Sequence, residues 1–313
     1  MSAVKISFIN FKGGVGKTTL AVNFSAMLGK KGYKTLLIDL DPQSNASIYL
    51  LDEETIKKRI SRAGGETHKT VYRLFVDAIR RENVFDFDDT VIRGAVRKNG
   101  VVINSYLDLL PNTYESLELE SELAGRYQTV DIRKILKRRL RRFNVDNEYD
   151  YIIIDCPPNL YTLSINGLLY SDYFIIPVFP DPFSHYGFSV LCREIYRIVE
   201  DEDEKPKLIG VVFSKVDLRA KKDKTRYIQT FFPDTFEKLK KGELYPNLNI
   251  EEIIHPNARI FGDEQYLFVQ SAWIPRTVDE HIPVVHYSKS YPLIKSYTEA
   301  MDRLVDEIIN ITK

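Results

Sequence analysis

A glycine-rich stretch near the start of the chain, NFKGGVGKTT (residues 10–19), constrains the fold more than any other segment. The apolar, β-branched residues 4–9 before it are typical of a buried strand, and residues 19–28 after it repeat apolar side chains at helical spacing. A glycine turn between a strand and a helix points backbone N–H groups and the positive end of the helix dipole at one spot. The stretch therefore predicts a phosphate-binding loop.

Further apolar runs indicate how the rest of the chain is built. Strand-like runs occupy residues 34–40, 151–155, 173–179 and 208–213, a shorter candidate occupies 107–110, and helical patterns lie between most of them. Strands that are apolar along nearly their whole length and alternate with helices form parallel sheets covered on both faces. We therefore predict an α/β fold with a mostly parallel twisted sheet flanked by helices.

Two longer stretches interrupt this alternation, at about residues 50–106 and 219–273. The first contains a helical pattern near residues 70–81, and an amphipathic helical pattern over residues 294–311 lies near the end of the sequence. The sequence has no linker rich in Pro, Gly or Ser and no internal repeat. We therefore predict one domain over residues 1–313, with the two stretches as helical insertions.

Composition excludes several other classes of protein. Hydrophobic residues make up 44% of the 313 residues, which is enough for a large core. Lys and Arg equal Asp and Glu at 44 each, so affinity for nucleic acid or acidic lipid has to come from a local patch. The two cysteines, Cys156 and Cys192, form no CxxC pair and indicate neither a disulfide framework nor a zinc site. With no apolar signal core and no apolar run long enough to span a bilayer, we expect a cytoplasmic protein.

Each polar residue of the glycine-rich loop has an expected task. Lys17 would reach the β- and γ-phosphates of a nucleotide, and the Thr18 hydroxyl would bind Mg²⁺. The predicted nucleotide-binding residues are Lys12, Gly13, Gly14, Val15, Gly16, Lys17, Thr18 and Thr19. The common pattern G-x-x-x-x-G-K-[ST] does not fit, because its first glycine is missing, whereas a second lysine, Lys12, opens the loop.

The loop matches the deviant pattern KGGxGK[ST], and with it the chain resembles ParA-type, Soj-like partition ATPases of the ParA/MinD group of P-loop proteins. The likeness continues in residues 107–124, 176–191 and 274–301. The resemblance implies ATP and Mg²⁺ as cofactors and a homodimer in which Lys12 reaches the phosphates bound by the other subunit. A cation supplied in trans stabilises the charge of phosphoryl transfer only when two subunits meet, so hydrolysis would be coupled to dimerisation. Because the loop begins at Lys12, we expect no N-terminal DNA-binding domain of the kind that longer members carry.

Carboxylates follow two of the predicted strands. Asp39 and Asp41 alternate at the end of one strand, and Asp155 ends another. Ligands of open parallel sheets bind at the carboxyl ends of strands, so we expect Asp155 to hold Mg²⁺ and Asp39 to lie near its coordination shell. The resemblance implies that Asp41 positions or activates the attacking water, which makes Lys12, Lys17 and Asp41 the predicted catalytic residues. A structural role as a helix cap or turn residue stays open for Asp39 and Asp41.

The resemblance also implies that the ATP-bound dimer binds DNA without sequence preference, through Lys and Arg on one surface. One candidate surface consists of Lys215, Arg219, Lys221, Lys222 and Lys224. The other is residues 132–143, where basic side chains would face outward from an apolar stripe. A solvated face with no ligand is the alternative for both.

The resulting prediction is an ATPase that segregates a plasmid or chromosome. Its dimer would bind the nucleoid, and a ParB-like centromere-binding partner would stimulate hydrolysis and release. One alternative is a MinD-like membrane switch, but we expect no membrane binding because the last residues carry more acidic than basic side chains. The other alternative, an ATP-dependent small-molecule ligase on the same fold, predicts a second substrate that stimulates ATP turnover without DNA.

Overall fold

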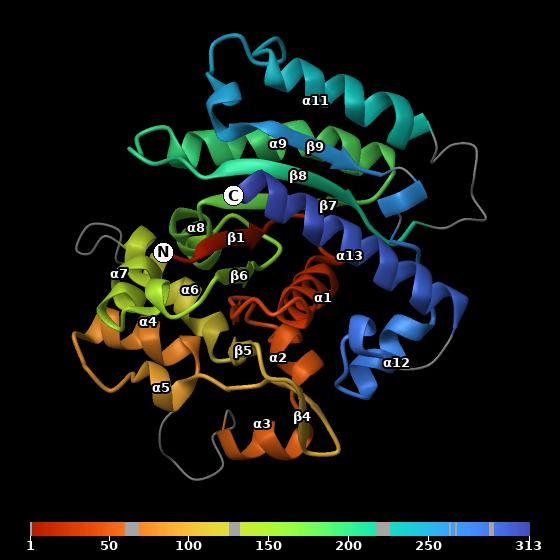
Figure 1. The fold of residues 1–313 in the computed structure, drawn as a ribbon. Helices are drawn as coiled ribbons and strands as arrows, with labels where there is room; N and C mark the ends of the chain where they lie inside the picture. Colours follow the sequence, from red (N-terminus) through yellow and green to blue (C-terminus); the bar gives the residue numbers. More distant parts are fainter. Residues whose placement is uncertain are drawn as a thin grey trace.

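The computed structural model describes residues 2–59, 69–124, 132–216, 226–262, 264–266, 268–287 and 291–313. A seven-stranded sheet with the order β5-β2-β6-β1-β7-β8-β9 runs through its centre (Figure 1). The strands are β1 (Val4–Phe8), β2 (Thr35–Asp39), β5 (Leu107–Leu110), β6 (Tyr151–Asp155), β7 (Tyr173–Val178), β8 (Lys207–Phe213) and β9 (Ile254–Phe261). All neighbouring strands of this sheet are parallel, which confirms the predicted fold class.

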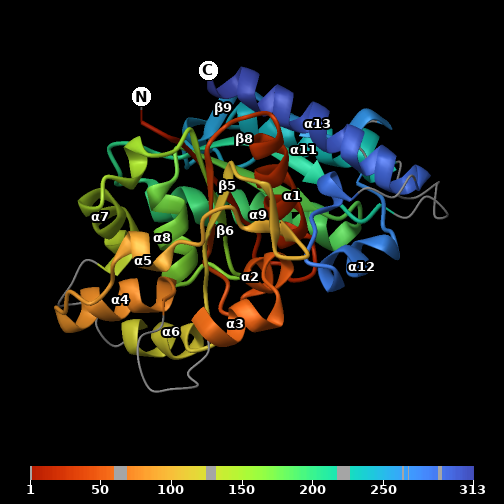
Figure 2. The same ribbon diagram turned by 60° about the horizontal axis from the view of Figure 1, so that its bottom comes forward.

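Helices cover both faces of the sheet (Figures 1 and 2). One face carries α1 (Lys17–Lys30), α2 (Asn45–Leu50), α3 (Glu53–Arg59), α12 (Trp273–Asp279) and α13 (Pro292–Thr312). The other carries α4 (Val71–Arg80), α5 (Phe87–Thr90), α6 (Ser116–Ala124), α7 (Ile135–Arg142), α8 (Thr162–Tyr170), α9 (Pro182–Val199) and α11 (Phe232–Lys240). Successive strand residues point to opposite faces, and accordingly Ile153 and Ile154 belong to different hydrophobic clusters.

Short elements complete the described chain. They are the antiparallel pair β3 (Val96–Lys98) and β4 (Val101–Asn104), and single turns at Ile132–Lys134, Val145–Asn147, Tyr227–Phe231, Ile250–Ile253, Glu264–Tyr266 and Val284–His286. The stretch 50–106, predicted as a helical insertion, thus contains this hairpin besides its helices. The prediction of a single domain with two insertions stays a prediction.

The strand β9 is a second departure from the sequence analysis, because it lies within the stretch 219–273 that we treated as an insertion. Its sequence contains Pro256 and Asn257, which disfavour a strand, and only part of it is buried. An edge position tolerates both residues, since among the described strands β9 has a hydrogen-bonded neighbour on one side only. The strands and helices predicted elsewhere are confirmed, including α1, α4 and α13.

The register of three central strands fixes the position of the glycine-rich loop. Phe8, the last residue of β1, pairs with Asp155, and Asp155 pairs on its other side with Asp39. The carboxyl ends of β1, β6 and β2 therefore lie at one level. The loop that follows β1 begins beside Asp155, and Asp39 lies one strand further along the sheet.

Close packing between α8 and the sheet generates a test of the fold. A Cβ atom at Gly167 in α8 would lie 2.9 Å from Cys156 Sγ and 2.9 Å from Leu40 Cδ1. Alanine favours helices over glycine, but the overpacking outweighs this gain, so we expect Gly167→Ala to lower the free energy of unfolding by roughly 1–3 kcal/mol. Urea denaturation measures the change. In the control Gly187→Ala, the nearest atom to the added Cβ would be in the Phe11 ring, at 3.4 Å, and we expect no loss. An equal loss in both variants would contradict the packing argument.

Candidate nucleotide-binding site

The loop between β1 and α1 holds a fixed shape that depends on its glycines. Gly14 and Gly16 have φ angles of 76° and 80°, in the left-handed region where a side chain would be strained. The Lys12 backbone N–H donates to Asn10 Oδ1 at 2.9 Å, and Asn10 Nδ2 in turn donates to the Pro177 carbonyl at 2.7 Å. Together these features hold the loop against the end of β7.

Helix α1 begins directly at this loop without a side-chain cap. Gly16 occupies the N-cap position, and the first turn contains no acidic residue. The N–H groups of a first helical turn lack partners inside the helix, and the helix dipole places positive charge there. The uncapped start of α1 therefore suits an anion, as the sequence predicted.

A cavity of about 330 Å³ opens above the loop. Its walls come from the loop, the turn after β2, the start of α2, and Pro158 after β6. Of the predicted nucleotide-binding residues, the ones that line it are Gly13, Gly14, Gly16, Lys17, Thr18 and Thr19. The Val15 side chain is instead buried in the interior, and its carbonyl accepts a hydrogen bond from Ser214 Oγ. Lys12 does not line the cavity.

Lys17 lies deep in the cavity and close to carboxylates. The residue is only 6% exposed, and its Nζ donates a long hydrogen bond of 3.4 Å to the Lys12 carbonyl. Burial lowers the pKa of Lys17, while the nearby Asp155 and Asp41 counteract that shift. A phosphate group in the cavity would supply the additional negative charge that stabilises the protonated amine.

Asp155 provides the strongest indication of a metal site. Its two carboxylate oxygens are fully buried, and neither accepts a hydrogen bond of ordinary geometry from the described residues. Burial raises the pKa of Asp155 well above its usual range and Asp39 raises it further, although the neighbouring Thr18 hydroxyl opposes the shift. Leaving a buried carboxylate unpaired is costly, and a divalent cation would remove that cost. The residues present therefore fit Mg²⁺, with Thr18 and Asp155 as donors.

Asp39, unlike Asp155, accepts several hydrogen bonds. One of its oxygens accepts hydrogen bonds from Ser47 N at 2.9 Å and Ser47 Oγ at 2.7 Å, and the other accepts from Asp41 N at 3.2 Å. Burial raises its pKa to about 7, against the effect of the Ser47 hydrogen bonds. Asp39 therefore anchors α2 to the end of β2. This geometry supports the structural alternative for Asp39, and its place near a metal stays a prediction.

Asp41 lines the cavity and faces the same space as Lys17. It is 6% exposed, and its Oδ1 accepts a hydrogen bond from Gln43 N at 2.9 Å. Burial raises the pKa of Asp41, whereas the Gln43 N–H and the charge of Lys17 lower it. A carboxylate held in this way at the wall of the cavity has the chemistry needed to orient a water molecule.

Lys12 lies at the rim, outside the cavity. Its Nζ donates to Asp181 Oδ1 at 3.2 Å, to Asp181 Oδ2 at 3.0 Å and to Ser184 Oγ at 3.0 Å. Both contacts belong to the start of α9. This segment is part of the likeness at residues 176–191, but the sequence predicted no role for Asp181 or Ser184. The signal was available, since Asp181, Pro182 and Ser184 form a helix-start pattern directly after a strand.

The predicted DNA-binding residues fall into two groups. Arg219, Lys221, Lys222 and Lys224 lie outside the described residues. Lys215 is described, and its side chain lines the loop cavity, next to Gly16. Its φ angle of 51° is in the left-handed region, which is uncommon for lysine. As a result, the position of Lys215 favours contact with a bound nucleotide.

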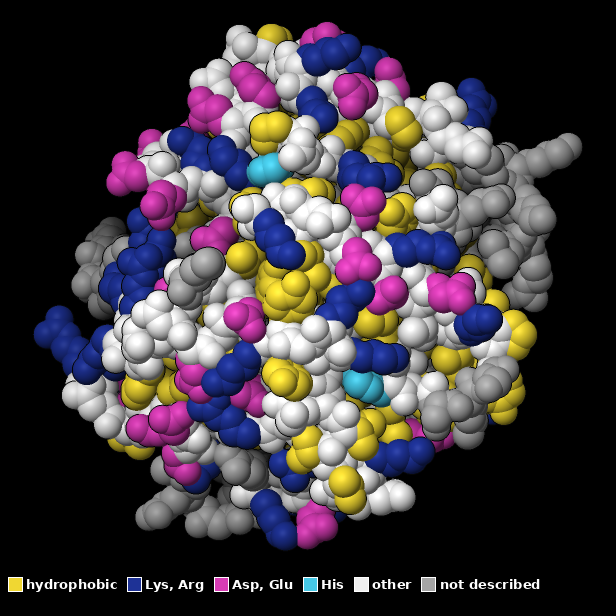
Figure 3. Space-filling view, viewed as in Figure 1, with side chains coloured by type: hydrophobic (Ala, Val, Ile, Leu, Met, Phe, Trp, Pro, Cys, Tyr) yellow, Lys and Arg dark blue, Asp and Glu magenta, His cyan; other side chains and the backbone are white. Residues whose placement is uncertain are grey.

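The second basic segment forms the amphipathic helix predicted for it, now seen as α7. Ile135, Leu136 and Leu140 are buried, while basic side chains gather over α7 at the left of Figure 3. Acidic side chains adjoin them, and Lys134 forms an ion pair of 2.6 Å with Glu202. Part of the positive charge on this surface is therefore neutralised within the chain.

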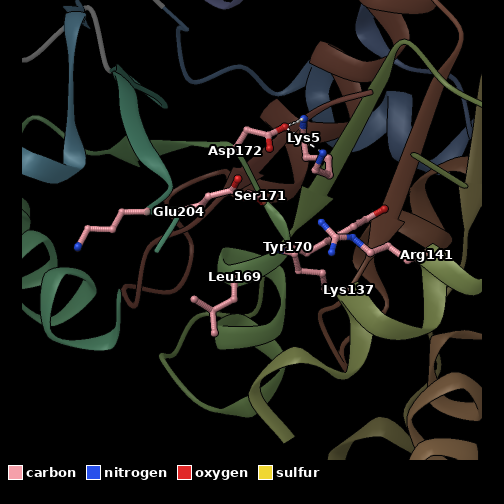
Figure 4. Close-up of a pocket in the computed structure, with 9 residues that line it drawn as sticks. Lys5, Lys137, Arg141, Leu169, Tyr170, Ser171, Asp172 and Glu204 are labelled. Atoms are coloured by element: carbon pink, nitrogen blue, oxygen red, sulfur yellow. Dashed lines mark hydrogen bonds and ion pairs between the residues drawn. The ribbon is translucent and has the colours of Figure 1, made fainter. Parts of the chain in front are cut away.

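A second polar cavity, of about 230 Å³, lies at the opposite end of the sheet (Figure 4). Lys5 at the start of β1 reaches toward Asp172, with which it forms a 3.1 Å ion pair, and Lys137 and Arg141 of α7 lie on another side. This cavity has no glycine loop and no helix start in its walls. Of these two cavities, the one above the glycine-rich loop is thus the candidate nucleotide site.

Comparison with known sequences identifies the family. A family model described as an AAA domain (AAA_31) matches residues 3–208. An uncharacterised protein of Methanocaldococcus jannaschii is 32% identical over 80% of this chain and 84% of its own length. The sporulation initiation inhibitor protein Soj of Bacillus subtilis is 34% identical over 69% of this chain and 74% of its own.

Solved structures show the same fold. The structure of pNOB8 ParA bound to nonspecific DNA has a TM-score of 0.68 and 20% identity, covering 99% of this chain and 98% of that one. Cobyrinic acid a,c-diamide synthase of Mycobacterium smegmatis, with an ATP analogue and magnesium, has a TM-score of 0.61 and 20% identity, covering 98% and 95%. Partition proteins and a synthase thus share this architecture, and the sequence relationship to Soj distinguishes between them. The chain belongs to the ParA-type partition ATPases of the P-loop family, and both the predicted family and the predicted enzyme class, an ATPase, are confirmed.

Proposed function

We propose that this ATPase forms a dimer around two Mg-ATP molecules, binds nonspecific DNA in that state, and releases the DNA after hydrolysis. Its cofactors are ATP and Mg²⁺. The observation that carries the proposal is the separation of the two loop lysines. Lys17 lines the cavity of its own subunit, whereas Lys12 lies outside that cavity with its side chain 31% exposed.

In this proposal the residues of the loop cavity have distinct tasks. The backbone N–H groups of the loop and Lys17 hold the phosphates, and Thr18 and Asp155 hold Mg²⁺, which supplies positive charge to the phosphate oxygens. Asp41 orients the attacking water, and Lys12 contacts the nucleotide of the neighbouring subunit. A lysine that acts only across an interface makes ATP turnover depend on dimerisation.

Transport of cargo would follow from this cycle. A ParB-like partner bound at a centromere site stimulates hydrolysis, so the DNA near the cargo loses its bound ATPase and the cargo moves toward regions that still carry it. The similarity to Soj of Bacillus subtilis and to a ParA solved with nonspecific DNA supports this proposal. DNA phosphates would contact basic side chains, for which α7 and the predicted group around Lys215 are the candidates.

Two features bear on the alternatives. None of the helices in the described ranges is long and apolar enough to cross a bilayer. The apolar face of α13 packs in the core, and Asp302 and Asp306 form ion pairs of 2.7 and 2.8 Å with Lys31, directly after α1. A lipid-binding tail would need this face free, so the packing disfavours a MinD-like switch. The ligase alternative is tested separately: it predicts that a small molecule stimulates ATP turnover in the absence of DNA.

Cosedimentation with long nonspecific DNA tests the proposal. We expect the protein to pellet with DNA when Mg-ATP is present, and much less with ADP or no nucleotide. Lys12→Ala should abolish the ATP-dependent part at the protein concentrations of this assay, because the dimer that presents the DNA-binding surface then forms too weakly. Anionic liposomes serve as the parallel arm. Binding to liposomes in place of DNA, or to neither, would contradict the proposal.

The unpaired carboxylate of Asp155 gives a test of the metal site. Burial raises the pKa of Asp155 in the folded protein, so without nucleotide or metal the wild type loses stability as pH rises from about 4, the unfolded value, through the folded pKa. Asp155→Asn removes this loss, and we expect its melting temperature at pH 8 to exceed that of the wild type by roughly 2 °C or more. Mg-ATP should then stabilise the wild type more than the variant, which keeps the phosphate contacts but lacks a metal ligand. A variant that is less stable without ligand, or that Mg-ATP still stabilises fully, would contradict the assignment.

A further inference from the structure

The contacts of Lys12 raise a question that the proposed function leaves open. A lysine that serves the neighbouring subunit needs a free ammonium group, yet in this chain the ammonium has three oxygen acceptors in its own subunit. The acceptors are Asp181 Oδ1 and Oδ2, at 3.2 and 3.0 Å, and Ser184 Oγ, at 3.0 Å. An amine has three protons to donate, so this set of partners satisfies it completely.

The acceptor side of this contact is fixed by the fold. Asp181 is the N-cap of α9, and its Oδ1 also accepts a hydrogen bond from Ser184 N at 2.7 Å. Burial alone would raise the pKa of Asp181, but the Ser184 N–H and Lys12 hold it below its usual value, so the carboxylate stays charged. Because the cap geometry sets the position of both oxygens, Lys12 finds a preformed site at the start of α9.

Aromatic rings surround the same ammonium group. Lys12 Nζ lies 5.3 Å from the centroid of the Phe179 ring and 6.0 Å from that of Phe183. Phe183 and the nearby Tyr186 are 80% and 75% exposed, among the most exposed large apolar side chains of the described residues. Both lie in the first turns of α9, the helix that Asp181 caps. The helix start that binds Lys12 therefore also carries exposed aromatic side chains.

We propose that Asp181 and Ser184 form a latch that holds Lys12 within its own subunit and releases it when a second copy of the chain presents bound nucleotide. This inference rests on the proposed function. The side chains of Lys12 and Asp181 are 31% and 32% exposed, so solvent weakens the ion pair and a phosphate group of higher charge can displace the carboxylate. Asp181 is a positioning residue, because it acts on the nucleotide only through Lys12.

The latch predicts that weakening it favours the dimer. Asp181→Asn keeps a good N-cap and removes the charge, so α9 should start in the same way while Lys12 is held less firmly. We measure dimer formation in the presence of Mg²⁺ and a non-hydrolysable ATP analogue. For each lysine released, the association constant should rise by up to about fivefold, and each dimer releases two lysines. Sedimentation velocity over a range of protein concentrations measures this constant. Ser184→Ala, which removes one acceptor and leaves the backbone N–H in place, should give a smaller rise in the same direction.

The double variant separates the latch from a merely structural role. In a Lys12→Ala background, Asp181→Asn should leave the association constant unchanged, because there is no ammonium group to hold. Asp172→Asn is the matched control, since Asp172 forms a similar ion pair with Lys5, at 3.1 Å, at the opposite end of the sheet. Asp172→Asn should leave the association constant of the dimer unchanged, both in the wild type and in the Lys12→Ala background.

The outcomes are distinguishable. A weaker or unchanged dimer in Asp181→Asn, or the same change with and without Lys12, would overturn the latch. If Lys12→Ala alone left the nucleotide-dependent dimer intact, the proposed function itself would fail, and the latch with it. A tighter dimer that depends on Lys12 supports both.

Discussion

The parallel register of β1, β6 and β2 is the constraint on which the rest of the site depends. It places Asp155 between Phe8 and Asp39, so two buried carboxylates lie side by side where the glycine-rich loop begins. Two buried carboxylates that lack cationic partners destabilise a folded chain. Asp39 avoids this cost by binding Ser47 and the backbone of Asp41, but Asp155 has no such hydrogen bonds. Among the described residues the sheet thus leaves one buried carboxylate, near Lys17, without a hydrogen-bond donor of ordinary geometry, next to a loop suited to phosphate.

The charges around the loop follow from this arrangement. Lys17 is buried between the loop and the carboxylates, and burial lowers its pKa while Asp155 and Asp41 oppose the shift. Lys12, by contrast, is compensated in its own subunit by Asp181. Both loop lysines therefore already lie near carboxylates of their own subunit. In our proposal, bound nucleotide and metal change this arrangement of charges, and a second subunit recognises the change.

Much of this could be predicted from the sequence, for physical reasons that differ between elements. The strands around the loop could be predicted because they are buried on both faces and are therefore continuously apolar. The loop could be predicted because its backbone conformation favours glycine at Gly14 and Gly16. The edge strand β9 could not be recognised from the sequence, because an edge strand tolerates Pro256 and Asn257, which disfavour strands elsewhere. The positions of the Lys215 and Lys12 side chains could not be predicted from the sequence either. Their residue type predicted a cation, but only the fold shows that Lys215 lines the cavity and that Lys12 pairs with Asp181.

The central claim is that Lys12 acts on the nucleotide of the other subunit, and mixing two inactive variants measures this directly. Lys12→Ala lacks the lysine that crosses the interface, and Asp41→Ala lacks the carboxylate that orients water in its own cavity. In a mixed dimer, the cavity of the Lys12→Ala subunit keeps its own Asp41 and receives Lys12 from its partner. The account predicts that each variant alone is nearly inactive and that the mixture recovers up to about a quarter of the wild-type ATPase rate, since half of the dimers are mixed and each has one complete site. A mixture that remains inactive, while forming mixed dimers, would contradict it.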